Sequence, residues 1–166
     1  MGIMQNSNVL IFGYGNPSRG DDALGPSSLE WLKARQYDGV EYLTDFQLQV
    51  EHAFDLEDRE LVLFVDASVS CPSPFAFERL EPAQDDSYTT HAMSPAAVLQ
   101  VYRDIRRREP PPSFLLSIRG ERFELGEGLS ASARENLDAA LKFAEALCAK
   151  PLLGYWLGLQ TGRRSG

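Results

Sequence analysis

Hydrophobic and polar positions divide the chain into strand-like and helix-like segments that alternate along its length. Continuous apolar runs at residues 8–13, 61–65 and 114–118 have the length and composition of strands buried on both faces. Residues 40–44 and 75–80 alternate apolar with polar positions, which is typical of strands with one solvated face. The strand at 75–80 is expected to lie antiparallel at an edge of the sheet.

Between the strands, apolar residues recur every three or four positions, which predicts helices. One such stripe covers residues 24–36, and residues 50–56 predict a short helix. Ser94 and Pro95 supply an N-cap and a first-turn proline for a further stripe at residues 98–105. Helices therefore separate most of the predicted strands.

The last helix is predicted from a capping pattern followed by a long apolar stripe. Ser132 with Glu135 reads as a capping box, and apolar positions then recur over residues 137–147. Cys148 continues this stripe and is expected in the core. Two cysteines, Cys71 and Cys148, are too few and too far apart for a disulfide framework or a CxxC metal site.

Strands alternating with helices predict an α/β fold. We expect a three-layer sandwich, with a mostly parallel central sheet flanked by helices on both faces. Residues 1–150 are predicted to form one domain and residues 151–166 a C-terminal tail, since Pro151 stops the preceding helix. The tail is expected to drape over the surface or fray, with Tyr155 and Trp156 available to pack back onto the body.

Composition and charge exclude several classes of protein. Of 166 residues, 43% are hydrophobic and 24% charged, as in ordinary soluble globular proteins. The net charge of -8 repels phosphate backbones and anionic membrane surfaces, and the arginines at 106–108 are expected to be solvated. The chain has no signal-peptide pattern and no window of about 18 apolar residues. We therefore expect a cytoplasmic monomer that binds neither nucleic acid nor membranes.

The turn after the first strand contains glycines and acids. Gly13 and Gly15 suggest a dinucleotide-binding fingerprint, but Ser18 stands where its third glycine belongs. Asp21 and Asp22 open the following helix, where they would repel a pyrophosphate. Taken alone, this acidic pair is explained by the positive end of the helix dipole.

A second acid and a histidine, elsewhere in the chain, favour a functional role for this turn. Asp66 directly follows the strand at 61–65, so it and Asp22 lie at the carboxyl edge of the sheet, where open α/β sheets bind ligands. His91 lies in a small polar loop before a helix. Together, Asp22, Asp66 and His91 predict a three-ligand site for a divalent metal with open coordination positions. The other histidine, His52, is expected to be a surface side chain.

These motifs resemble those of the hydrogenase maturation proteases. The family's opening GxGN turn and acidic pair are matched by Gly13, Gly15, Asn16, Gly20, Asp21 and Asp22. Asp66, in FVDAS, resembles the second metal-binding acid, and His91, in THAMSP, resembles the family's histidine. Residues 119–130 also resemble a late segment of the family, so the resemblance extends from about Val9 to Leu147.

The resemblance implies an aspartic-type or metal-dependent endopeptidase, with Asp22, Asp66 and His91 as catalytic and metal-binding residues. Such enzymes remove the C-terminal extension of the nickel-iron hydrogenase large-subunit precursor after nickel insertion, so the precursor is the expected partner and source of nickel. One loop departs from the family, since residues 45–49 read DFQLQ where a DGGT-like stretch is common. Substrate contacts by the loop at 46–49 are therefore not predicted.

Other hydrolase classes fit the sequence less well. No GxSxG elbow is present, and neither cysteine has the context of a nucleophile. A peptidyl-tRNA hydrolase-like enzyme shares the early GNP turn, but the acidic charge disfavours a transfer-RNA substrate. A nickel-binding maturation chaperone that does not cleave its client stays open as a second alternative.

Overall fold

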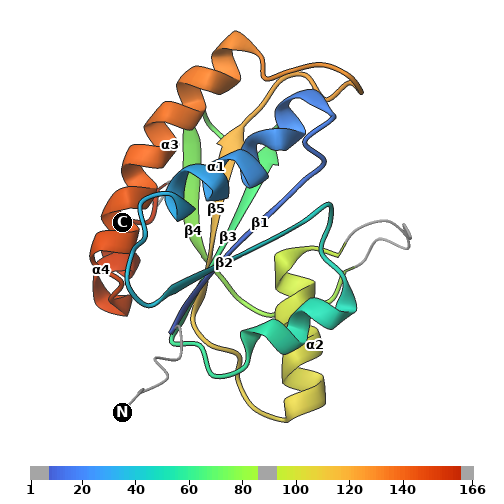
Figure 1. Ribbon diagram of the computed structural model, residues 1–166. Coiled ribbons are helices and arrows are strands. Elements are labelled where there is room, and N and C mark those ends of the chain that lie inside the picture. Colours follow the sequence, from blue (N-terminus) through green and yellow to red (C-terminus); the bar gives the residue numbers. More distant parts are fainter. Residues whose placement is uncertain (1–7, 86–92, 162–166) are drawn as a thin grey trace, which may run out of the picture.

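The computed structural model of the chain, which describes residues 8–85 and 93–161, contains a single five-stranded sheet (Figure 1). Its strands are β1 (Val9–Tyr14), β2 (Val40–Asp45), β3 (Leu61–Ser68), β4 (Phe75–Leu80) and β5 (Ser113–Arg119). They lie in the order β2-β1-β3-β5-β4. All neighbours are parallel except β4, which pairs antiparallel with β5 at the edge. The mostly parallel sheet and its antiparallel edge strand are confirmed.

Helices cover both faces of this sheet (Figure 1). One face carries α1 (Leu24–Lys33), α3 (Ala131–Ala149) and α4 (Leu153–Gly158). The other carries the 3-10 helix η2 (Val50–Leu56) and α2 (Pro95–Arg106), while the short 3-10 helix η1 (Gly20–Ala23) links β1 to α1. The predicted three-layer sandwich is confirmed. None of the helices in the described ranges is long and apolar enough to span a membrane.

Alternation along the strands divides the interior into two cores. Val9 and Ile11 of β1 pack with α1 and α3, whereas Leu10, Phe12 and Tyr14 pack with η2 and α2. β3 behaves in the same way over residues 61–65, where, as in β1, every residue is buried and apolar side chains alternate between the two faces. The last three residues of β3, which begin with Asp66, are still paired with β5 but are only partly buried.

Serine hydroxyls cap the two long helices. Ser94 accepts a hydrogen bond from the Ala97 amide at 3.1 Å, as predicted for α2. For α3 the predicted capping box at Ser132 is wrong, because Ser130 is the N-cap and accepts from the Ala133 amide at 3.2 Å. A contact between Ser130 and Asp21, which is distant in sequence, fixes this earlier start.

The chain after Pro151 does not drape or fray over its described part. It forms α4, and Trp156 is completely buried as part of the same core as α1 and α3. The Trp156 indole N–H donates to the carbonyl oxygens of Leu147 and Lys150 at 3.1 and 3.2 Å. Its ring packs edge-on against Phe114. Pro151 follows the end of α3 as expected, and Tyr155 and Trp156 pack back onto the body, which was the role left open for them.

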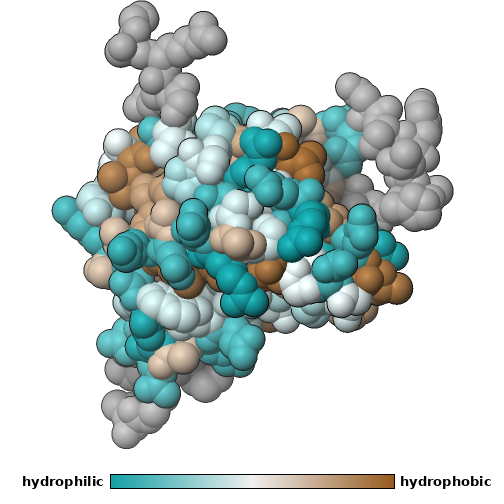
Figure 2. Space-filling model, turned by 90° about the horizontal axis from the view of Figure 1, so that it is seen from above, coloured by the Kyte–Doolittle hydropathy of each residue, from teal (hydrophilic) through white to brown (hydrophobic). Residues whose placement is uncertain are grey.

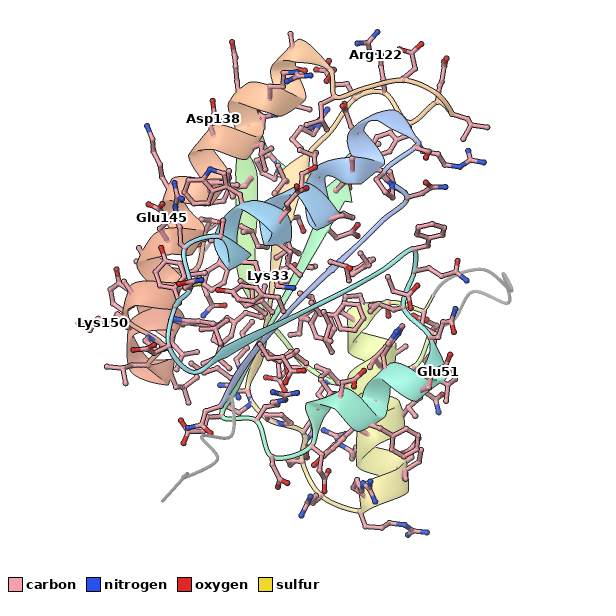
Figure 3. All side chains as sticks on the ribbon, in the orientation of Figure 1. Lys33, Glu51, Arg122, Asp138, Glu145 and Lys150 are labelled. Carbon is pink, nitrogen blue, oxygen red and sulfur yellow. The ribbon has the colours of Figure 1, made fainter. Side chains whose placement is uncertain are left out.

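The outer surface of this helical layer is charged. Asp138 and Glu145 lie along the side of α3 that faces away from the sheet (Figure 3), and Lys150 follows at its end. Cys148 lies on the opposite, inner side and is 4% exposed, which confirms its predicted place in the core. The amphipathic pattern of α3 therefore matches its position.

Candidate active site

Three neighbouring strands end in polar residues at the carboxyl edge of the sheet. The parallel register pairs Tyr14 of β1 with Asp45 of β2, and pairs Gly13 with Val65, so that Tyr14 and Asp66 follow at adjacent positions. Since side chains alternate between the faces of a strand, Asp45, Tyr14 and Asp66 lie on the face covered by η2 and α2. This row is the base of the candidate site.

Asp66 is a partly buried acid with an altered proton affinity. Burial, which disfavours the charged carboxylate, and the nearby charge of Asp22 raise its pKa to about 7. A hydrogen bond from the Tyr14 hydroxyl and one from the Ala67 amide act in the opposite direction without cancelling the effect. Asp66 is therefore an acid that titrates near neutral pH in the metal-free protein.

Asp22 approaches the same place from η1. Its carboxylate accepts a hydrogen bond from the Asn16 amide at 2.6 Å, which closes the turn after β1. Gly15 makes this turn possible, because it has a φ of +144° and a Cβ there would lie 2.1 Å from the carbonyl oxygen of Asp22. The charge of Asp22 also raises the pKa of Tyr14, after the larger effects of burial and Asp66. Asp22 and Asp66 are thus near neighbours, as predicted.

Asp21, next in sequence, has a different role. It is completely buried, and its carboxylate accepts hydrogen bonds from the amides of Glu121, Arg122 and Ser130 and from the Ser130 hydroxyl. Burial alone would raise its pKa, but these donors outweigh burial and lower it. Asp21 fastens the segment after β5, in which Figure 3 labels Arg122, to the first turn. Of the acidic pair, only Asp22 is free to bind a ligand.

The third predicted ligand, His91, lies outside the described residues. Within the described ranges, no three His, Cys, Asp or Glu side chains are grouped closely enough to hold a metal. Asp22 and Asp66 nevertheless suit a cation, because neither is paired with a lysine or arginine in the part of the chain that is described. Two adjacent carboxylates repel each other unless a proton or a cation is shared between them.

The prediction that His52 is a surface side chain is wrong. His52 is 9% exposed, and its ring packs edge-on against Phe12 with centroids 4.6 Å apart. Its Nδ1 accepts a hydrogen bond from the Gln49 amide at 2.8 Å, and its Nε2 lies 3.1 Å from Asp45 Oδ2. His52 is part of the cap of η2, and it orients an acid at the edge of the site.

A shallow cavity of about 250 Å³ adjoins the site on the side of β2. It is lined by Gly15, Pro17, Pro26, Thr44, Asp45 and Phe46. Phe46 is 66% exposed, and two more large apolar side chains, Val69 and Leu125, are exposed in the segments after β3 and β5. Figure 2 shows the molecule from above, with hydrophobic patches between polar side chains on this surface.

Two residues of this region, Tyr14 and His52, were not identified from the sequence as contributing to it. For Tyr14 a pattern was available, because β1 and β3 are aligned in parallel and period two places Tyr14 and Asp66 on one face. For His52 no local pattern shows that Nε2 reaches Asp45, since this contact depends on how η2 lies on the sheet.

Solved structures with this fold include several hydrogenase maturation proteases. HybD from E. coli, a hydrogenase maturating endopeptidase, is 26% identical with a TM-score of 0.65, over 84% of this chain and 91% of that one. The [NiFe] hydrogenase maturation protease HycI from Thermococcus kodakarensis is 21% identical with a TM-score of 0.68, over 87% and 94% of the two chains. An endopeptidase from Escherichia coli is 23% identical with a TM-score of 0.67, over 87% and 94%.

The sequence by itself matches no protein-family model and no curated protein. Its likeness to known proteins therefore rests on its motifs and on the fold. Both point to the same group, and the structural matches extend over most of the chain. The chain has the fold of the hydrogenase maturation proteases and resembles that family over more than 80% of its length.

Proposed function

We propose that this protein is an endopeptidase that removes the C-terminal extension of a nickel-iron hydrogenase large-subunit precursor after nickel insertion. The observation that carries the proposal is the meeting of Asp22 and Asp66 at the carboxyl edge of the sheet, in a fold shared with HybD. Ligands of open α/β sheets bind at this edge. His91 is proposed as the third metal-binding residue.

Nickel enters this proposal as part of the substrate. Asp22 and Asp66 supply two oxygen ligands and His91 a nitrogen, and this set leaves coordination positions for groups of the precursor. A divalent metal held in this way can polarise a peptide carbonyl or activate a bound water. The contribution of the protein is to fix the scissile bond relative to the metal, so that only a nickel-loaded precursor is aligned for cleavage.

The unequal surroundings of the two acids support metal binding. Asp66 binds its proton up to about pH 7 because of burial and the charge of Asp22. A cation placed between the two carboxylates favours the charged form of Asp66, against both its burial and the charge of Asp22, so metal binding should release the proton. The pair is therefore poised to exchange a proton for a metal near neutral pH.

The surface around the acids fits a polypeptide partner. Phe46, Val69 and Leu125 are 62–67% exposed, and each follows a strand that ends at the site edge of the sheet. Exposed apolar side chains that gather around polar groups mark surfaces for binding other proteins. We infer that the precursor covers these side chains when its C-terminal segment reaches the acids.

Mass spectrometry of the intact precursor tests the proposal. Purified protein is mixed with metal-free and with nickel-loaded precursor, and with casein as an unrelated substrate. One cut in the nickel-loaded precursor alone is expected. Equal cleavage of the metal-free precursor would contradict nickel recognition, whereas no cleavage of either form would favour a chaperone that binds its client without cutting it.

Matched variants assign the reaction to the site. Asp66→Asn keeps the size of the side chain and should abolish cleavage, because the neutral amide is a poor metal ligand. Asp138→Asn removes an exposed acid on the far side of α3 and should cleave normally. Hydrolysis of peptidyl-tRNA by the wild-type protein, with no action on any precursor, would favour the alternative hydrolase.

A further inference from the structure

We propose that Tyr14 is a positioning residue for the metal site: its hydroxyl holds the carboxylate of Asp66 in the orientation that binds the metal. The inference rests on the proposed function, since it concerns the same site. Tyr14 is not one of the residues on which the family resemblance depends. It occupies the variable position between Gly13 and Gly15 in the GxGN turn.

The Tyr14 ring is held firmly. The side chain is 9% exposed and belongs to the core between the sheet and the η2 and α2 layer. Phe12, two residues earlier on the same strand, packs edge-on against it with centroids 6.4 Å apart. The backbone just after Tyr14 is also fixed, because the Gly15 amide donates to the Asp45 carbonyl at 3.1 Å. A ring held in this way places its hydroxyl at one point.

The hydroxyl is a hydrogen-bond donor to the ionised carboxylate of Asp66. It donates to the Asp66 carboxylate, and the charge of Asp22 also acts on it. A phenol carries its proton at neutral pH, so the hydroxyl has a hydrogen to donate. The Tyr14 hydroxyl and the Ala67 amide each occupy an acceptor position of the carboxylate, which has further acceptor positions for a metal.

Packing alone does not account for a tyrosine at this position. Phenylalanine would fill the same space beside Phe12 without placing a polar atom in the core. The buried hydroxyl has a partner because Asp66 lies on the adjacent strand and the same face. Partners of this kind orient metal-binding carboxylates, and their removal costs about 10- to 100-fold in metal affinity or activity.

Calorimetric titration of Ni²⁺ into the full-length protein tests the inference without the precursor. Tyr14→Phe should bind Ni²⁺ about tenfold or more weakly than the wild type. Tyr102→Phe is the control, since Tyr102 is also buried, 4% exposed, but its hydroxyl accepts a hydrogen bond from Arg108, just beyond the end of α2. The control should bind Ni²⁺ as the wild type does. Melting curves establish that both variants are folded.

A second comparison separates positioning from a general effect on structure. In a protein that already carries Asp66→Asn, the further change Tyr14→Phe should leave the residual Ni²⁺ affinity unchanged, because the group that Tyr14 orients is gone. A further loss of affinity in the double variant would assign Tyr14 a structural role and overturn the inference.

The outcomes also separate this inference from the proposed function. If wild type and Tyr14→Phe bind Ni²⁺ equally while Asp22→Asn and Asp66→Asn bind it weakly, the positioning role is refuted and the metal site stands. If the wild type binds no Ni²⁺, or if Asp22→Asn and Asp66→Asn bind it as the wild type does, the metal site itself is refuted and both conclusions fall.

Discussion

Exchanging each of the two adjacent acids for its amide should have opposite consequences. Asp21→Asn should destabilise the fold, because Asp21 is completely buried and accepts four hydrogen bonds. Asp22→Asn should leave the fold intact and abolish processing, since Asp22 is partly exposed, accepts one bond from the Asn16 amide and faces Asp66. The two variants differ by one position in the sequence and involve the same chemical change.

The cost of Asp21→Asn follows from the donors around it. One oxygen of Asp21 accepts from the Ser130 amide at 2.7 Å, and the other accepts three bonds at 2.7 to 3.0 Å. An asparagine fits best with its NH2 group toward the Ser130 amide. The hydrogen bond from that amide is then lost, and two N–H donors face each other. Since a hydrogen bond to a charged group contributes about 1.5–3 kcal/mol, the loss should be about 2–4 kcal/mol.

The pH dependence of the free energy of unfolding gives a second test of the role of Asp21. Backbone and hydroxyl donors lower the pKa of Asp21 in the folded state, so its ionised form stabilises the fold at any pH above the unfolded-state value of about 4. That stabilisation disappears as the pH falls through the folded-state pKa. The difference in stability between wild type and Asp21→Asn should therefore be constant near neutral pH and shrink in acid.

Urea unfolding followed by far-UV circular dichroism measures the free energy of unfolding at several pH values, in the presence of a chelator. Asp138→Asn serves as the control, since Asp138 is an exposed acid. Intact-mass analysis of the precursor measures processing by each variant. Wild-type stability in Asp21→Asn, or a loss in Asp22→Asn as large as that in Asp21→Asn, would refute the assignment of the two roles.

Four further predictions follow from the structure. In metal-free protein, burial raises the pKa of Asp66 to about 7, so the wild type loses folding stability as the pH rises towards that value. Asp66→Asn lacks this titration and should become more stable relative to wild type as the pH rises from about 5 to 8. If the free energies of unfolding of the two proteins, measured in urea, changed equally with pH, that would contradict this. His91→Ala should fold normally and lose processing, whereas normal cleavage would remove His91 from the site. His52→Ala should lower the free energy of unfolding by about 2–3 kcal/mol, since its ring nitrogens bond on both sides, and an unchanged urea midpoint would contradict that role. Trp156→Ala should cost about 3–5 kcal/mol because the ring is fully buried, a loss that a freely draping tail would not show.

Local sequence patterns determined the layers of the fold. Buried strands are continuously apolar and helices repeat every three to four residues, so the β1, β3 and β5 segments, α2 and α3 were all predictable without the structure. The edge strand β4 was predictable for the same reason, because its alternation marks one solvated face. The position of Asp22 and Asp66 also followed, since parallel strands place their carboxyl ends at one edge.

Tertiary structure decided the roles of individual polar residues. Asp21 and Asp22 have the same side chain, and only donors about 100 positions away in the sequence make Asp21 structural. The same contact moves the cap of α3 to Ser130. His52 is buried because η2 lies against Phe12, and Trp156 because the end of the chain returns to the core. Periodicity reports which face of an element is buried, but not which distant groups its polar atoms meet, and those partners determine whether a side chain is structural or free to bind a substrate.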